Sequence, residues 1–304
     1  MSLRVLMAVV GVPWAIDQTK GWAICQFLAD RAVSGRYSEA EIDAILAENA
    51  GKVHPAKERS IQGADGAVAV IPIQGVMAQH MSLLGRMSGG SSTDAIGRQV
   101  SAAAGDPNVK AIVLHVESPG GSTYGLPELA DRIFEARSAK PVIAHVDSYA
   151  ASAAYWVASQ ATEVVASPGG DVGSIGVYAL HDDYSKALEK AAVKRTMVYA
   201  GKYKVEGNPA EPLSEEGRDA MQQRVDAAYK DFLTAVARGR DTDVDTVAET
   251  YGEGRMVRAT DALKRGMVDR IATFEETIKR FAGPPSRTRE RALELKRLEI
   301  AELS

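Results

Sequence analysis

The segment KAIVLHVESPGGSTYGLPELADRIFEARSAKPVIAHV, residues 110–146, decides the fold class. It starts with an apolar run of strand length at 110–116 and turns sharply over 117–122. Helical spacing follows over 126–137, and a second apolar run occupies 141–146. A strand, a helix and a strand in this order predict a right-handed crossover between parallel strands of one sheet.

The same alternation continues on both sides of this segment. Other apolar runs of strand length lie at 67–73, 163–166, 174–177, 196–199 and 266–271. Other segments with helical spacing lie at 93–104, 151–159 and 213–240. The last of these carries one apolar face, formed by Met221, Val225, Ala228, Phe232 and Val236. The sequence therefore predicts an α/β fold with a mostly parallel sheet and crossover helices.

The chain divides into three parts. Residues 1–66 are predicted to be an N-terminal helical extension, with a helix start at Ser38 and a polar linker over 52–66. Residues 67–282 hold the α/β alternation. Residues 283–304 are predicted to form a charged helical tail, which is either solvated or docked on a partner.

Composition excludes several classes of protein. The 304 residues carry a net charge of −4, which argues against nucleic-acid binding. The single cysteine, Cys25, permits no intrachain disulfide. The five histidines lack metal-ligand spacing, so we expect no metal and no cofactor. Residues 5–16 loosely resemble a signal peptide but lack a clear cleavage site, which favours a packed N-terminal segment and no stable membrane anchor.

Two loops stand where a parallel sheet gathers its active site, after the carboxyl ends of strands. Ser118-Pro-Gly-Gly121 could bring backbone N–H groups close to a ligand, although taken alone it is better explained as a tight turn. The second loop places Ser152 between an apolar strand and an alanine-rich helix. A serine there lies at a helix N-terminus, which favours negative charge. Taken alone, the position is better explained by helix capping, with Ser148 or Ser152 as the N-cap.

A catalytic serine needs a base. His115 and His145 lie within predicted strands, His181 follows another, and no feature ties any of them to Ser152. A lysine can serve where burial lowers its pKa towards neutrality. The segment Ala200-Gly-Lys-Tyr-Lys204 follows the predicted strand at 196–199 and contains two lysines, but a lysine alone is a weak signal.

Taken together, three segments resemble the signal peptide peptidase A (protease IV) family of serine peptidases. They are Ser118–Gly121, Ala150–Tyr155 with Gly173–Val177 after it, and Ala200–Lys204. The resemblance extends from about Ala67 to Ile271 and implies a crotonase/ClpP-like fold.

The resemblance also implies a role for each matching residue. Ser152 would be the nucleophile and Lys204 the general base of a Ser–Lys dyad. The N–H groups of Gly121 and Ala153 would form the oxyanion hole, and Ser174 would orient the lysine amine. In this chain alanines follow the serine where many members have glycines, a change that keeps the backbone donor.

Within that family the chain looks most like the head maturation proteases of tailed phages. The resemblance then implies capsid, scaffold or portal proteins as substrates, a ring-like homo-oligomer, and a location in the host cytoplasm, including the phage prohead. Three other readings stay open. They are a cellular peptidase that degrades signal peptides, an acyl-CoA hydratase or isomerase on the same fold, and a non-catalytic capsid scaffold.

Overall fold

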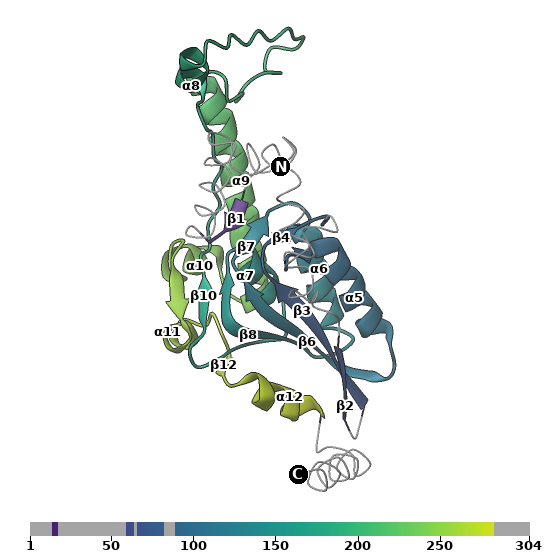
Figure 1. Cartoon of the computed structure of the whole chain (residues 1–304). Coiled ribbons are helices and arrows are strands. Elements are labelled where there is room, and N and C mark those ends of the chain that lie inside the picture. The colour runs from purple at the N-terminus through teal and green to yellow at the C-terminus, as the bar shows by residue number, and fades with distance from the viewer. Residues whose placement is uncertain (1–13, 18–58, 64–65, 82–88, 283–304) are drawn as a thin grey trace, which may run out of the picture.

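The computed structural model describes residues 14–17, 59–63, 66–81 and 89–282 (Figure 1). The helix predicted to start at Ser38 and the charged tail at 283–304 lie outside these residues. The main sheet has eight strands in the described part of the chain. They are β2 (Arg59–Gly63), β3 (Gly66–Gln74), β6 (Val109–Ser118), β8 (Val142–Ala151), β9 (Glu163–Ala166), β10 (Asp171–Gly173), β11 (Met256–Arg258) and β12 (Arg270–Ile271).

Parallel pairing dominates this sheet. Strands β3, β6 and β8 lie side by side in parallel, and β8 pairs in parallel with β9 at its start and with β10 at its end. Strands β2 and β11 are added antiparallel at the two edges. The predicted α/β fold with a mostly parallel sheet is therefore confirmed.

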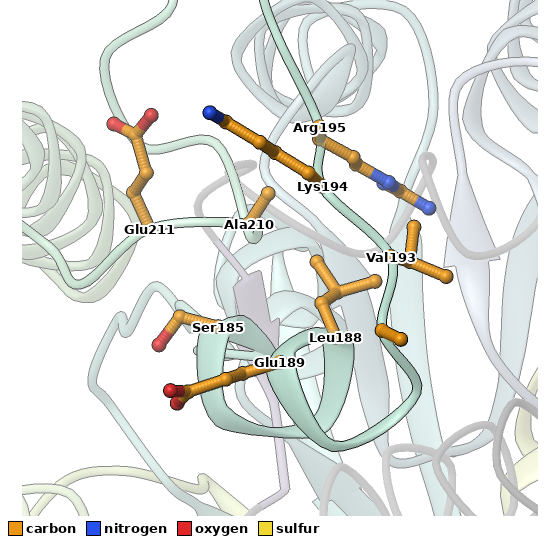
Figure 2. A pocket seen from close by; sticks show the side chains of 9 residues that line it. Ser185, Leu188, Glu189, Val193, Lys194, Arg195, Ala210 and Glu211 are labelled. Atoms are coloured by element: carbon orange, nitrogen blue, oxygen red, sulfur yellow. The ribbon is translucent and has the colours of Figure 1, made fainter.

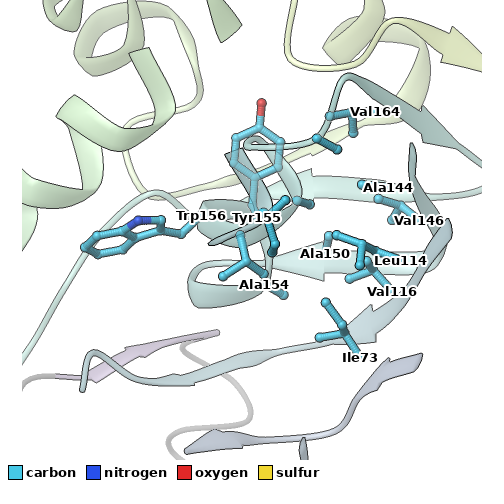
Figure 3. Close-up of a cluster of buried hydrophobic side chains, with 14 of the residues drawn as sticks. Ile73, Leu114, Val116, Ala144, Val146, Ala150, Ala154, Tyr155, Trp156 and Val164 are labelled. Carbon is cyan, nitrogen blue, oxygen red and sulfur yellow. The ribbon is translucent and has the colours of Figure 1, made fainter. Parts of the chain in front are cut away.

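The two faces of the sheet are covered differently, because side chains alternate along each strand. One face packs against α5 (Thr93–Gly105), α6 (Leu126–Ala136) and α7 (Ala153–Ala158) in the main core, part of which is drawn in Figure 3. Trp156 of α7 also stacks on Phe232, with ring centroids 4.7 Å apart, and so anchors α9 (Glu215–Arg240). The other face packs against α12 (Phe274–Ala282).

A smaller sheet lies beside the main one. It orders β1 (Trp14–Ile16), β7 (Gly120–Ser122), β4 (Met77–Ala78) and β5 (Ser91–Ser92). Strand β7 follows β6 after a break at Pro119, so the smaller sheet continues from the carboxyl end of the central strands. The remaining helices are α8 (Ser185–Lys190), α10 (Val244–Thr250) and α11 (Ala259–Lys264).

Residues 180–227 form an arm that extends away from the two sheets (Figure 1). The arm contains α8 and the N-terminal half of α9, and Gly217 is the one residue of this described segment that is buried. Only the C-terminal half of α9 enters the core, through Phe232, Leu233, Val236 and Ala237. The apolar face predicted along this helix is therefore covered at one end and only half-buried at the other.

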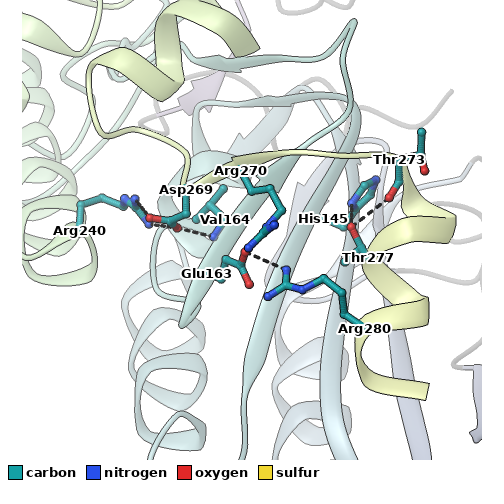
Figure 4. A network of polar contacts seen from close by, with 9 residues as sticks. All are labelled: His145, Glu163, Val164, Arg240, Asp269, Arg270, Thr273, Thr277 and Arg280. Carbon is teal, nitrogen blue, oxygen red and sulfur yellow. Dashed lines mark hydrogen bonds and ion pairs between the residues drawn. The ribbon is translucent and has the colours of Figure 1, made fainter. Parts of the chain in front are cut away.

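Ion pairs join the C-terminal end of α9 and the segment that follows it to the main sheet (Figure 4). The Arg240 guanidinium binds both carboxylate oxygens of Asp269, at 2.6 and 2.8 Å. Asp269 in turn accepts the Val164 N–H at 2.7 Å. Because a bidentate pair fixes geometry as well as charge, this contact sets the position at which α9 ends against β9.

Two predicted strands are wrong, and both lie in the arm or at its base. Residues 174–177 leave the sheet because Ser174 has a positive φ of 54°, which ends β10 at Gly173. Residues 196–199 form no strand, and Val198 is 97% exposed. The strand predicted over 266–271 is confirmed only at Arg270–Ile271. The segment predicted as a polar linker, 52–66, contains β2.

A buried histidine gives the fold a pH dependence. His145 lies under α12, where its Nδ1 lies 3.0 Å from the Thr277 hydroxyl. Burial, reinforced by His115 and opposed by Asp147, lowers the pKa of His145 to about 4. The unfolded chain then binds this proton more tightly than the folded chain does.

We expect the free energy of unfolding to fall by about 3 kcal/mol as the pH drops from about 6.5 to about 4. His145→Asn keeps a donor and an acceptor but does not titrate, so it should flatten that part of the profile. The control is His80→Asn, since His80 is exposed. Urea unfolding at stepped pH measures this, and an unchanged slope in His145→Asn would contradict it.

Candidate active site

Ser152 lies at the junction where β8 ends and α7 begins. Its backbone has φ 56° and ψ −120°, a region that non-glycine residues rarely adopt. The Ser152 N–H donates to the Gly173 carbonyl oxygen at 2.7 Å, and the Trp156 N–H donates to the Ser152 carbonyl at 2.9 Å. The strained junction is therefore held from both sides, which is a feature of functional positions.

Two backbone segments converge on this junction. Ala153 is the first residue of α7, so its N–H has no acceptor within the helix. A Cβ built on Gly120 would lie 2.9 Å from the Ala153 nitrogen, so β7 passes directly beside the start of α7. A Cβ on Gly121 would lie 1.9 Å from the Met77 carbonyl oxygen. Only glycines permit this approach, which places the predicted oxyanion donors on adjacent segments.

The turn that carries these glycines is held by Ser118. Its hydroxyl donates to the Gly75 carbonyl at 2.6 Å and accepts the Gly120 N–H at 3.2 Å. The Gly75 N–H donates to the Glu117 carbonyl at 3.1 Å. In the sequence this turn stands out by its glycines, and in the structure the two hydrogen bonds of the Ser118 hydroxyl hold it rigid.

Ser174, which the resemblance implied would orient the lysine amine, lies beside Ser152. Strand β10 pairs with β8 so that Gly173 faces Ala151, and each serine follows directly. Ser174 has a positive φ as well, and its N–H donates to the Arg255 carbonyl at 2.9 Å. The Ser152 hydroxyl donates to the Gly176 carbonyl at 3.4 Å. The structure thus brings together Ser152, Ala153, Ser174 and the Gly120–Gly121 pair.

The structure does not bring Lys204 to this group. Lys204 is exposed on the arm, and its amine makes no hydrogen bond or ion pair with any residue in the described part of the chain. Its neighbour Lys202 forms an ion pair with Glu216 at 3.5 Å, which places both lysines beside the first turn of α9.

Helix geometry shows how far away the arm carries Lys204. Helix α7, which follows Ser152, contacts α9 at Phe232. The helix axis between Glu216 and Phe232 measures about 24 Å at 1.5 Å per residue. A lysine side chain cannot span that distance, so Ser152 and Lys204 of one chain do not meet in this conformation.

No histidine within residues 89–282 takes the place of the lysine. Over residues 89–282, no hydrogen bond links a histidine to Ser152, and His115 and His145 contact Phe274 of α12 on the opposite face of the sheet. Across the described ranges, no cluster of three histidine, cysteine or acidic side chains could hold a metal ion. No helix in those same ranges is long and apolar enough to cross a membrane.

The fold and the site together define a class of protein. A serine at a strained strand–helix turn beside backbone N–H donors is the arrangement used for nucleophilic attack on a carbonyl group. Residues 135–283 match peptidase family S49, and this segment of the chain belongs to that family. The predicted family of serine peptidases is thereby confirmed.

Individual relatives come from phages and from cells. The chain is 33% identical over 248 residues to capsid assembly protease C of Escherichia phage lambda, covering 81% of this chain and 56% of that protein. It is 33% identical over 240 residues to head-tail preconnector protein GP5 of Enterobacteria phage P21, covering 79% and 46%. It is 32% identical over 174 residues to a putative signal peptide peptidase SppA of Enterococcus faecium, covering 57% and 50%.

The chain spans about half the length of these curated relatives. Among solved structures, a ClpP1 mutant from Listeria monocytogenes superposes with a TM-score of 0.42 at 12% identity. That superposition covers 69% of this chain and 94% of the other.

Gly121→Ala tests the close approach of β7. Because the added methyl would overlap the Met77 carbonyl, we expect thermal unfolding several degrees below wild type and a loss of most reactivity of Ser152 towards a fluorophosphonate. Gly169→Ala is the matched control, since a Cβ there meets nothing within 4 Å. Equal stability and labelling in the two variants would show that β7 does not need a glycine at 121.

Proposed function

We propose that the chain is a serine endopeptidase in which Ser152 attacks the peptide carbonyl and Lys204 of a neighbouring copy is the base. One observation carries the proposal: Ser152 lies beside convergent backbone donors in the sheet domain, whereas Lys204 lies on an arm that projects from it. The arm gives Lys204 a position that a second copy can use and its own chain cannot.

The chemistry follows from these groups. The Ser152 Oγ forms a bond to the carbonyl carbon while its proton passes to the lysine amine. The N–H groups of Gly121 and Ala153 stabilise the oxyanion. The protonated amine then gives its proton to the leaving nitrogen, and the peptide bond breaks to leave an acyl-serine. Water, deprotonated by the same amine, releases the acid and restores the serine.

The surface of the arm supports its docking on a neighbour. Four of the seven large apolar side chains that are exposed in the described structure lie on it, namely Val193, Val198, Tyr199 and Tyr203. An open hollow of about 440 Å³ lies there too, lined by apolar Leu188 and Val193 and by charged Lys194 and Glu211 (Figure 2). Apolar side chains in such numbers on a projecting segment are typical of protein interfaces. We therefore propose a ring-like homo-oligomer.

The substrate class rests on the phage relatives. The names of these relatives refer to capsid assembly and to the head–tail connection. We propose that this chain processes capsid, scaffold or portal proteins during head maturation, in the host cytoplasm or within the prohead.

Single substitutions test the dyad. Ser152→Ala and Lys204→Ala should each lower peptidase activity by at least about a thousandfold, and the double variant should be no worse, because the two residues act as a unit. Lys202→Ala should keep most of the activity, since its amine pairs with Glu216. Hydrolysis of purified capsid and scaffold proteins, followed by mass mapping of new termini, measures this. If Lys202→Ala is inactive and Lys204→Ala remains active, the general base is Lys202 and not Lys204.

Mixing the two inactive proteins tests whether the dyad is shared. When Ser152→Ala and Lys204→Ala subunits exchange, some interfaces join an intact serine to an intact lysine, so part of the activity should return. Subunit exchange is verified beforehand by energy transfer between labelled copies. A mixture that exchanges and stays inactive contradicts the shared site. Wild-type protein that forms oligomers and still neither cleaves nor reacts with a fluorophosphonate would instead favour a capsid scaffold without catalysis.

A further inference from the structure

Strand β1 occupies an unusual place for so short an element. On one edge, Trp14 exchanges two hydrogen bonds with Tyr178, at 2.8 and 3.0 Å. On its other edge, β1 runs antiparallel to β7, with Ala15 opposite Gly121. The two segments that hold β1 are therefore the turn that carries the predicted oxyanion donor and the chain that follows Ser174.

The ladder shows what β1 does to the Gly121 N–H. The Asp17 N–H donates to the Pro119 carbonyl at 2.7 Å. In an antiparallel pair the hydrogen-bonded positions recur every second residue, so Ala15 and Gly121 also exchange their N–H and C=O groups. The Gly121 N–H is thus already donated, to the Ala15 carbonyl oxygen.

The same carbonyl lies beside the second predicted donor. A Cβ built on Gly120 would lie 2.2 Å from the Ala15 oxygen and 2.9 Å from the Ala153 nitrogen. Both atoms therefore border one small space next to Ser152. In that space β1 presents a peptide carbonyl to the two groups that would stabilise an oxyanion.

The residues at this contact are buried from solvent. Ala15 and Ser152 are both 0% exposed, and Ile16 is 4% exposed. A serine nucleophile without accessible surface cannot receive a substrate until something moves. Because both edges of β1 are hydrogen-bonded, a substrate strand cannot be added beside it at this place and has to replace it.

We infer that β1 is an internal occupant of the peptide-binding groove, a segment of this chain that holds the position of a substrate strand and blocks the site until it is displaced. Substrate would bind as an extended strand between β7 and Tyr178, with backbone hydrogen bonds like those of Trp14 and Ala15. This inference rests on the proposed function and adds to it the location of the groove and a means of control.

Proline at position 15 tests the inference in the full chain. Ala15→Pro removes the N–H that pairs with Gly121 and fixes a φ unsuited to the strand. We expect Ser152 to react with a fluorophosphonate about fivefold faster or more, with little change in thermal unfolding. Ala15→Gly keeps both backbone groups and serves as the control, with a rate near wild type. A folded Ala15→Pro that reacts no faster than Ala15→Gly overturns the inference.

A peptide added in trans gives a second measurement that does not depend on the folding of this variant. A synthetic peptide with the sequence of residues 11–19 should compete with β1, bind next to Ser152 and slow labelling of the wild-type chain in a concentration-dependent way. The same peptide with proline in place of Ala15 should have at least fivefold less effect. Equal effects of the two peptides, or none, would show that β1 is a fixed wall of the site.

Binding of the fluorescently labelled peptide to Ser152→Ala, read by anisotropy, separates the two proposals. Peptide that binds, with discrimination against the proline version, supports the groove even where no cleavage is found, in which case only the proposed function fails. Cleavage of capsid proteins without any peptide binding leaves the proposed function standing and overturns the groove.

Discussion

The hydrogen bond from the Ser152 N–H to the Gly173 carbonyl oxygen is the contact on which the rest of the site depends. It ties the ends of β8 and β10 together at the point where both strands leave the sheet. Ser152 and Ser174 each follow with a positive φ, a costly conformation that persists only where the surroundings fix it. Parallel pairing supplies that support, and so two serines distant in the sequence become neighbours.

A second constraint comes from the close approach of backbones. Strand β7 has no room for side chains at 120 and 121, because Met77 lies on one side of it and the start of α7 on the other. The two glycines are thus required by packing before any catalytic role is considered. The same contact brings backbone N–H groups to Ser152 without a charged side chain, which suits a junction enclosed by the apolar side chains of β8 and α7.

The sequence predicted the parts of this structure whose cause is local. Apolar runs and helical spacing gave the order of β3, β6, α6 and β8. The rule that sites gather at strand ends pointed to the loops that carry Gly121 and Ser152, whereas Ser174 was implied only by the family resemblance. Residues 196–199 were wrongly predicted as a strand because an apolar run indicates burial but does not show which surface covers it. Within the described part of one chain nothing covers Val198, which is exposed. Strand β1 could not be found, since three residues carry no signal of pairing with a strand a hundred residues away. The separation of Lys204 from Ser152 depends on where α9 meets the core, which is a tertiary property.

The sequence did not predict the pairing of β1 or the separation of Lys204 from Ser152, and both depend on the same segment of the chain. Tyr178, whose backbone holds one edge of β1, lies immediately before the arm that carries Lys204. Under the two proposals, a neighbouring copy that binds the arm would also displace the segment at Tyr178, whose backbone hydrogen bonds hold β1 in place. One binding event then supplies the missing base and loosens the strand that fills the groove. An isolated chain would lack the base and hold a blocked groove, so it would be inactive for two separate physical reasons. Under the two proposals, that arrangement would restrict proteolysis to the assembled state, where the substrate proteins would be gathered.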